Sequence, residues 1–228
     1  MNLYYWIAIG ITAVISMLAN SFVMRSYAQY KEIRTRSGLT GAQVARKILD
    51  DNGLHDVAVV RGSGGTLSDF YDPSKKIVSL SPDNYANASV AASAVAAHEV
   101  GHAIQHATGY KFIALRNMLL KPTIIASQFS QIAIIIGLTS TALTGLFDLG
   151  IIMISIILAF QVVTLPVEFN ASARALKIIK SDGIVDSSEY GGAQKMLTAA
   201  ALTYVAAVIG TLLNLLYFVM LRGSRNRD

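Results

Sequence analysis

The chain contains no cysteine, and charged residues make up only 14% of its 228 residues. The absence of cysteine excludes disulfides and thiolate metal sites, so a bound metal would need His, Asp or Glu ligands. The scarcity of charge comes with 53% hydrophobic residues and a positive mean hydropathy, which is unusual for a soluble domain of this size. The composition therefore predicts an integral membrane protein.

Four stretches contain no charged residue and are long enough to cross a bilayer as helices. They are Met1 to Met24, Pro122 to Phe147, Leu149 to Val167 and Met196 to Leu221. The first lacks the basic start and the cleavage site of a secretory signal, so we expect a retained anchor. The pI near 9.4 reflects basic residues that flank the spans and meet lipid head groups, so we expect a lipid bilayer and no nucleic acid as partner.

Lysine and arginine concentrate in the segments between the first and second and between the third and fourth spans. Residues 25–121 hold twelve Lys or Arg against eight Asp or Glu. Segments rich in these residues stay cytoplasmic, so we expect both segments on that side. The tail disagrees, because four spans would place Arg222, Arg225 and Arg227 outside. Two explanations stay open. Either the charges of the earlier segments determine the orientation of the spans despite the tail, or one apolar stretch is a re-entrant or interfacial helix.

The most informative motif is His98-Glu99-Val100-Gly101-His102. It lies in an alanine-rich stretch from Asn87 to Gly109 that contains no proline and is expected to be helical. Residues four apart on a helix are offset by about 40° and rise by about 6 Å, so both imidazoles can bind one zinc ion. Glu99 would face the same cleft as general base. The alternative, two ordinary helix histidines, is weak because the chain has only four.

A catalytic zinc usually has three protein ligands, so the two histidines need a partner from elsewhere. His106 continues the same face, but it lies about 12 Å along the helix from His98, too far for one ion to bind both. It is better interpreted as a surface histidine or a residue behind the ligands. A metzincin motif would require glycine and histidine where this chain has Gln105 and Thr108. That class is excluded.

Glu168 is the strongest candidate for the third ligand. It follows Pro166 at the expected cytoplasmic end of the third span, and a carboxylate so close to a span rarely lacks a function. The proline predicts a kink or a helix restart that turns the carboxylate towards the motif helix. Asn170 or Ser172 could orient it. The alternatives are that Glu168 marks the membrane boundary or pairs with Arg174, which could instead stabilise an oxyanion.

A small mixed region precedes the motif helix. Thr40 is a credible N-cap for a helix over Ala42 to Asp51. Val57 to Arg61 resembles a strand, and Tyr71 to Ser74 marks a tight turn into a second strand at Lys76 to Leu80, which together predict a β-hairpin. The second strand either binds an extended substrate along its edge or merely covers the motif helix.

Four segments together are more specific than the zinc motif alone. They are Leu67 to Pro73 (LSDFYDP), Val78 to Ser81 (VSLS), Ala96 to His106 (AAHEVGHAIQH) and Pro166 to Ser172 (PVEFNAS). Through them nearly the whole chain resembles the bacterial neutral zinc metallopeptidases of YugP type. The resemblance implies a membrane zincin of gluzincin type, with one catalytic Zn²⁺ held by His98, His102 and Glu168 and with Glu99 as catalytic base.

Two positions depart from related patterns. The family often has His after the Asp of the first segment, where this chain has Phe70. The chain is also distantly similar to the HtpX and CAAX-protease families, which have Asp four residues after the later Glu. Here that position is Ser172, so the residues behind the ligands are expected to differ.

The sequence therefore predicts an α-helical integral membrane protein of about four transmembrane helices with a small α+β zincin-like metallopeptidase domain. The expected division is an anchor at 1–24, a catalytic domain at 25–121, a transmembrane hairpin at 122–167, a helical segment with the third ligand at 168–195, a transmembrane helix at 196–221 and a basic tail at 222–228.

The expected activity is zinc-dependent endopeptidase cleavage of peptide or membrane-protein substrates, in processing or quality control, at the cytoplasmic face of a bacterial plasma membrane. Glu99 would take a proton from zinc-activated water. The alternative is a zinc-binding scaffold or regulator without turnover. A transporter is weaker, because Gln128, Gln131 and Gln161 are more simply interhelical hydrogen-bond partners. Small residues such as Ser130 and Gly137 would permit packing within one chain or with a second copy or membrane partner.

Overall fold

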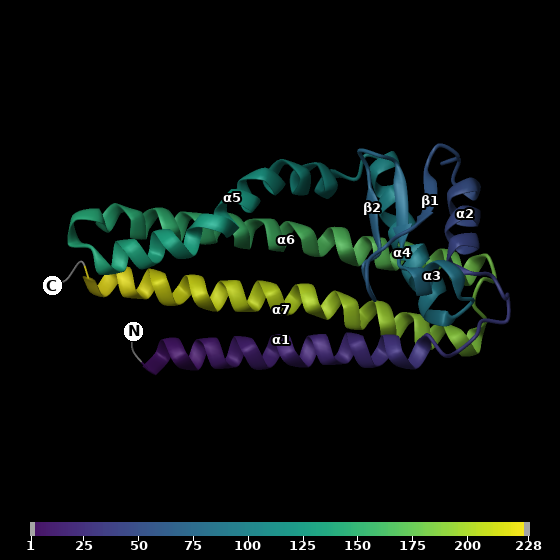
Figure 1. Ribbon diagram of the computed structural model, residues 1–228, viewed down its shortest axis with the longest axis horizontal. Coiled ribbons are helices and arrows are strands. Elements are labelled where there is room, and N and C mark those ends of the chain that lie inside the picture. The colour runs from purple at the N-terminus through teal and green to yellow at the C-terminus, as the bar shows by residue number, and fades with distance from the viewer. Residues whose placement is uncertain (1–2, 226–228) are drawn as a thin grey trace. The chain divides into compact units, whose positions relative to one another are not determined.

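The computed structural model describes residues 3–225, shown in Figure 1. In chain order the elements are α1 (Leu3–Tyr30), α2 (Gly41–Asp51), β1 (Ala58–Arg61), β2 (Phe70–Asp72), β3 (Ile77–Leu80), α3 (Pro82–Ala86), α4 (Val90–Ala107), α5 (Lys111–Thr139), a 3-10 turn (Thr141–Leu143), α6 (Thr144–Ser181) and α7 (Ser187–Arg225). The chain divides into two compact units. The helical unit comprises Met1–Asn20, Ala114–Pro166 and Thr203–Asp228, and the mixed unit comprises Ser21–Ile113 and Val167–Leu202.

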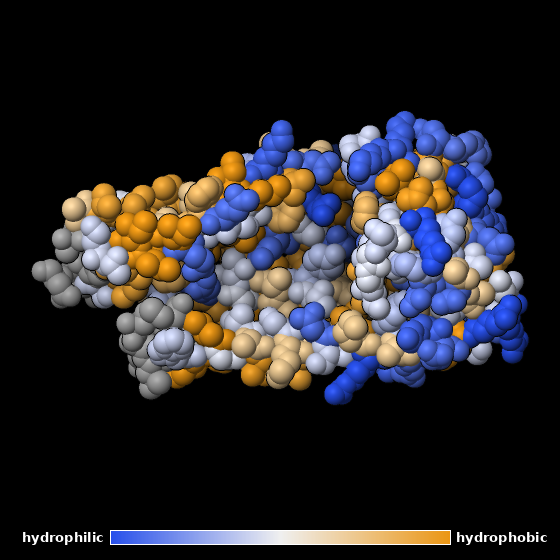
Figure 2. Space-filling model, viewed as in Figure 1, coloured by the Kyte–Doolittle hydropathy of each residue, from blue (hydrophilic) through white to orange (hydrophobic). Residues whose placement is uncertain are grey.

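Four helices are long and apolar enough to cross a membrane, in agreement with the expected number. They are Ile9–Tyr30, Lys111–Thr139, Thr144–Ser181 and Ser187–Ser224. In Figure 2 hydrophobic residues gather over helices of the helical unit, and hydrophilic residues gather over the mixed unit. The exposed apolar side chains of these helices, such as Ile132, Ile152 and Met220, suit contact with lipid.

The bounds of the middle helices differ from the charge-free stretches. α5 begins at Lys111 and continues through Pro122, and the chain turns at Ser140 and the following 3-10 turn. That turn carries no charge, so the charge pattern could not locate it and placed the link at Asp148, which lies inside α6. α6 also runs unbroken through Pro166, so the expected helix restart does not occur. Packing of the residues after the proline on α4 overrides the local preference.

The positive tail is partly neutralised within the helical unit. The Arg222 Nε lies 2.7 Å from Asp148 Oδ1, and its Nη2 donates to Asp148 Oδ2 at 3.0 Å. The pair joins the start of α6 to the end of α7. Carboxylates add little to the orientation signal, however, so the charges of the tail still disagree with the expected orientation. Arg227 lies outside the described residues.

The mixed unit contains a three-stranded sheet of order β1-β3-β2. The expected hairpin between the strands at 57–61 and 76–80 is wrong, because β1 pairs with β3 in parallel, from Ala58↔Ile77 to Arg61↔Leu80. The hairpin is formed instead by β2 and β3, which are antiparallel. Asp72 stabilises its turn by accepting hydrogen bonds from the backbone of Ser74 and Lys75. The expected turn region thus includes a strand of its own.

Local sequence signals fix the start of α2 and both ends of α4. Thr40 caps α2 as expected and forms a capping box with Gln43. Ser89 caps α4, accepting a hydrogen bond from the Ala92 N–H. α4 ends in a Schellman motif, in which the Gly109 N–H donates to the His106 carbonyl, the Tyr110 N–H donates to the Gln105 carbonyl, and Gly109 has φ +62°. The motif-bearing helix is therefore fixed at both ends.

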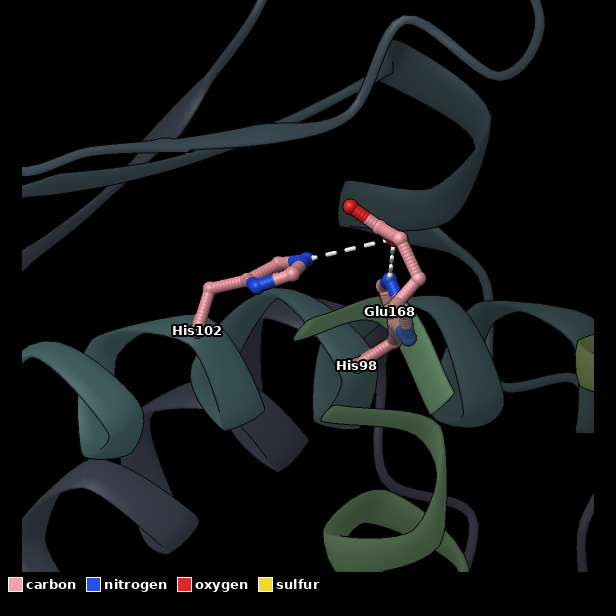
Figure 3. A group of neighbouring side chains, drawn as sticks. All are labelled: His98, His102 and Glu168. Carbon is pink, nitrogen blue, oxygen red and sulfur yellow. Dashed lines mark ion pairs between the residues drawn. The ribbon is translucent and has the colours of Figure 1, made fainter. Parts of the chain in front are cut away.

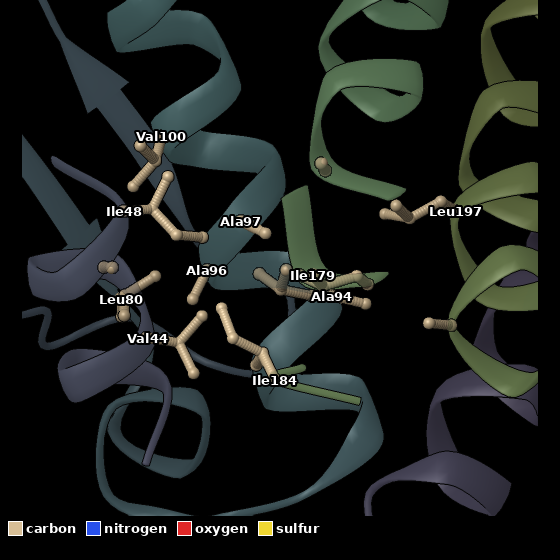
Figure 4. Close-up of a cluster of buried hydrophobic side chains, with 14 of the residues drawn as sticks. Val44, Ile48, Leu80, Ala94, Ala96, Ala97, Val100, Ile179, Ile184 and Leu197 are labelled. Carbon is tan, nitrogen blue, oxygen red and sulfur yellow. The ribbon is translucent and has the colours of Figure 1, made fainter. Parts of the chain in front are cut away.

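α4 lies at the centre of the mixed unit's core, as Figure 4 shows. Its small side chains allow the neighbouring elements to approach closely. Around it pack α2, the strand β3, the end of α6 and the start of α7, through the fully or nearly fully buried residues Val44, Ile48, Leu80, Ala94, Ala96, Ala97, Val100, Ile179, Ile184 and Leu197. Burial of α4 on so many sides gives the motif a rigid support.

A hydrogen-bonded carboxylate joins three segments of the mixed unit. Asp69, just before β2, accepts from the Ser81 N–H at 2.7 Å and from the Asn84 side-chain amide at 2.8 Å. The Asn84 carbonyl oxygen accepts in turn from the Tyr27 hydroxyl of α1 at 3.0 Å. Burial raises the pKa of Asp69, against the opposing effect of its hydrogen bonds to Ser81 and Asn84.

This raised pKa predicts a pH-dependent contribution to stability. The contribution favours the folded state below about pH 4, and is lost as pH rises through the higher folded-state pKa. Asp69→Asn cannot ionise, so the melting temperature of the wild type minus that of the variant should fall as pH rises from about 4. Thermal unfolding in detergent measures this difference. A wild-type minus Asp69→Asn difference that stays constant with pH would contradict the prediction.

Candidate metal centre

Three side chains predicted as zinc ligands lie together in the mixed unit. His98 and His102 stand one turn apart on α4, and Glu168 reaches them from α6 (Figure 3). The Glu168 Oε2 lies 3.3 Å from the His98 Nε2 and 3.6 Å from the His102 Nε2. One ligand atom from each residue lies within 4.8 Å of the others. Segments 66 to 70 residues apart in sequence thus converge on one point.

The arrangement fits a tetrahedral zinc ion. Ligand atoms bound at about 2.0–2.1 Å with tetrahedral angles lie about 3.4 Å apart, close to both observed separations. The Glu168 Oε2 is buried and accepts no hydrogen bond within the part of the chain that the structure describes. A buried carboxylate oxygen without a donor is costly unless a cation satisfies it. Two imidazoles and a carboxylate are also among the donors that zinc accepts.

Charge interactions link these residues with Glu99. Glu99 is buried on α4, and burial raises its pKa, against the opposing effect of His98 and His102. Asp69 and Glu168 add a smaller upward effect as like charges. Burial alone would lower the pKa of His102, but the nearby carboxylates of Glu168 and Glu99 raise the pKa more. Glu99 therefore belongs electrostatically to the same cluster.

Three other residues noted in the sequence are not part of the group of ligand candidates. His106 is exposed, and its Nδ1 is 3.5 Å from the Tyr71 hydroxyl of β2, outside the group formed by the three ligand candidates. Arg174 donates from Nε to the Asn170 Oδ1 at 2.8 Å, not to Glu168. Phe70, where the family often has histidine, is 48% exposed at the start of β2.

Each ligand candidate on α4 has a partner at its other ring nitrogen. The His98 Nδ1 lies 3.1 Å from the Ser172 Oγ, and the His102 Nδ1 lies 3.0 Å from the Gln105 Oε1. Ser172 therefore contacts a histidine rather than Glu168, the residue it was expected to orient. The sequence analysis missed Gln105. The available signal was its position three residues after His102, which places both on one helix face.

The strand that was expected to bind a substrate along its edge is the central strand of the sheet. β3 lies between β1 and β2, so both of its edges are already paired. The interpretation of Lys76 to Ser81 as a substrate-binding edge is therefore wrong. Within the described residues the open edges of the sheet belong to β1 and β2, and β2 packs against α4.

Comparisons with known proteins show the family of the chain. The family described as "Putative neutral zinc metallopeptidase" matches residues 5–223. The chain belongs to this family. It is also 45% identical, over 209 residues, to the protein described as "Putative membrane protease YugP" from Bacillus subtilis (strain 168), and the match covers 91% of each chain. No solved structure matches the chain significantly. The chain is thus a membrane member of a zinc metallopeptidase family, as its four apolar helices and the resemblance predicted.

Gly101 permits the close approach of the two helices that bear the centre. A Cβ added at Gly101 would stand 2.8 Å from the Ala171 carbonyl oxygen of α6. Gly101→Ala should therefore push α6 away from α4, with a loss of about 1–3 kcal/mol in stability. The displacement should also lower zinc content, because His98 lies on α4 and Glu168 lies on α6, so the ligands would move apart. Thermal unfolding and metal analysis of the purified protein measure the two effects.

Gly191→Ala in α7 is the matched control. Its added Cβ meets no atom within 4 Å, so stability should be unchanged or rise by about 0.5–1 kcal/mol, the usual gain of alanine over glycine in a helix. Zinc content should stay at the wild-type value. Full zinc occupancy in Gly101→Ala would show that the contact does not position the ligands.

Proposed function

We propose that this protein is a membrane-bound zinc-dependent endopeptidase of gluzincin type, with one zinc ion held by His98, His102 and Glu168. The observation that supports this most is the convergence of three ligand atoms around the donor-free oxygen of buried Glu168. Zinc bound there would lower the pKa of a coordinated water towards neutrality and polarise a peptide carbonyl. Three protein ligands leave the fourth position of a tetrahedral ion free, as catalytic zinc sites require.

Glu99 is the proposed general base. It follows His98 directly on α4, and it interacts electrostatically with both histidines and with Glu168. From this position its carboxylate takes a proton from water as the water attacks the substrate carbonyl. The same group then gives that proton to the leaving amine. Burial favours proton uptake, because it destabilises the charged form of the carboxylate.

The proposed substrates are membrane proteins or their juxtamembrane segments, cleaved on the cytoplasmic side during processing or quality control. Glu168 directly follows the charge-free stretch Leu149 to Val167, so the site lies at the end of an apolar span. The basic residues on that side, among them Arg174, Lys177 and Lys180, favour a cytoplasmic location. The combination of a buried charge cluster with a span end supports this class of substrate.

The test compares zinc content and cleavage of casein or a membrane-protein substrate by the detergent-purified wild type and variants. Glu99→Gln should retain zinc and lose cleavage by about 10²–10⁴-fold, because only proton transfer is removed. Glu168→Ala should lose zinc as well as cleavage. Glu32→Gln, at an exposed glutamate of the connector after α1, is the control and should match the wild type in both readouts.

Other outcomes point to other functions. Zinc bound without any cleavage that depends on Glu99 would favour a zinc-binding scaffold or regulator. Full zinc occupancy in Glu168→Ala would overturn the proposed ligand set. Absence of zinc from the wild type, even after addition of zinc, would overturn the metal centre as a whole.

A further inference from the structure

The two histidines of the proposed centre are supported in chemically different ways. The Ser172 hydroxyl beside the His98 Nδ1 can either donate or accept a hydrogen bond. It therefore holds the ring without specifying which ring nitrogen bears the proton. The carboxamide oxygen of Gln105 beside the His102 Nδ1 can only accept. A Gln105 oxygen at this position therefore requires a proton on the His102 Nδ1.

The orientation of the Gln105 amide is fixed by α6. Gln105 is fully buried, and its Nε2 donates to the Val167 main-chain carbonyl at 2.8 Å and to the Asn170 Oδ1 at 3.0 Å. A main-chain carbonyl can only accept, so the amide nitrogen must face Val167. A flipped amide would place its oxygen against two acceptors and its nitrogen against His102. The amide oxygen therefore faces His102.

Asn170 is fixed in the same way from its other side. The Arg174 Nε donates to the Asn170 Oδ1 at 2.8 Å, and a guanidinium nitrogen cannot accept. The oxygen of Asn170 must therefore face both Arg174 and Gln105. Two groups with only one possible role, the Val167 carbonyl and the Arg174 guanidinium, thus determine the direction of every hydrogen bond in this network.

We propose that Gln105 is a positioning residue that accepts a hydrogen bond from the His102 Nδ1–H, so that Nε2 is the ring nitrogen that binds the metal. The network lies entirely on α4 and α6 and involves neither the metal nor a substrate. The orientation of the Gln105 acceptor is consequently fixed by the protein itself, without the metal. Ser172 orients His98 without fixing its tautomer. This inference rests on the proposed metal centre.

The first test is the zinc affinity of the full-length protein in detergent, measured by competition with a chelator. Gln105→Leu should weaken zinc binding about 10–100-fold, the usual cost of losing a hydrogen-bond partner behind a metal ligand. Ser172→Ala should cost clearly less than Gln105→Leu. Asn170→Asp keeps the acceptor and should bind zinc nearly as well as the wild type, whereas Asn170→Leu should weaken binding.

Ser93→Ala is the matched control on the same helix. Ser93 is fully buried, and its hydroxyl has no hydrogen-bond partner within the described part of the chain, so its loss should leave zinc affinity unchanged. Melting temperatures of the zinc-free proteins separate unfolding from altered affinity. If Gln105→Leu does not fold, the comparison of Asn170→Leu with Asn170→Asp tests the same network.

The second test detects the His102 Nδ1 proton directly, by nitrogen NMR of the zinc-free protein labelled with ¹⁵N-histidine. The wild type should show a protonated Nδ1 at His102, and Gln105→Leu should lower the share of rings that are protonated at Nδ1. An unprotonated Nδ1 at His102 in the wild type, or wild-type zinc affinity in Gln105→Leu, would overturn the inference. These results leave the proposed function intact, which fails only if the wild type binds no zinc or cleaves without Glu99.

Discussion

The close packing of α4 on α6 is the constraint on which the proposed centre depends. α4 brings His98 and His102, α6 brings Glu168, and neither helix alone supplies a complete ligand set. Gly101 lets the two backbones approach, since even a methyl group there would meet the Ala171 carbonyl. The same contact aligns the residues behind the ligands with the rings they hold. Geometry at the centre is therefore a property of one helix pair.

Residues whose roles depend on local pattern could be predicted from the sequence. The spacing of His98 and His102 and the cap at Thr40 follow from local helix geometry and were expected at the positions where the structure has them. Glu168 was expected from its place beside a charge-free stretch and from the family resemblance. Glu168 lies near the histidines because α6 packs on α4.

Features that depend on tertiary pairing could not be predicted in this way. Nothing in the strand at 58–61 distinguishes parallel pairing with β3 from a hairpin, because both use the same alternation of side chains. Ser140 and the uncharged turn after it lack the charge or proline that would separate two apolar helices. Gln105 resembles any polar helix residue until α6 is in place, and only then do the Val167 carbonyl and Asn170 give it a role.

The hydrogen bond from Tyr27 to Asn84 has a consequence for how the chain may be divided. Tyr27 is 3% exposed and belongs to the core of the mixed unit, although it lies near the end of the first apolar helix. The first apolar helix and the folded core thus share this turn of α1, and Asn84 connects it to Asp69 and the hairpin. That helix cannot be removed without opening the core. A soluble fragment cut from the chain beyond Tyr27 would lack part of its own interior.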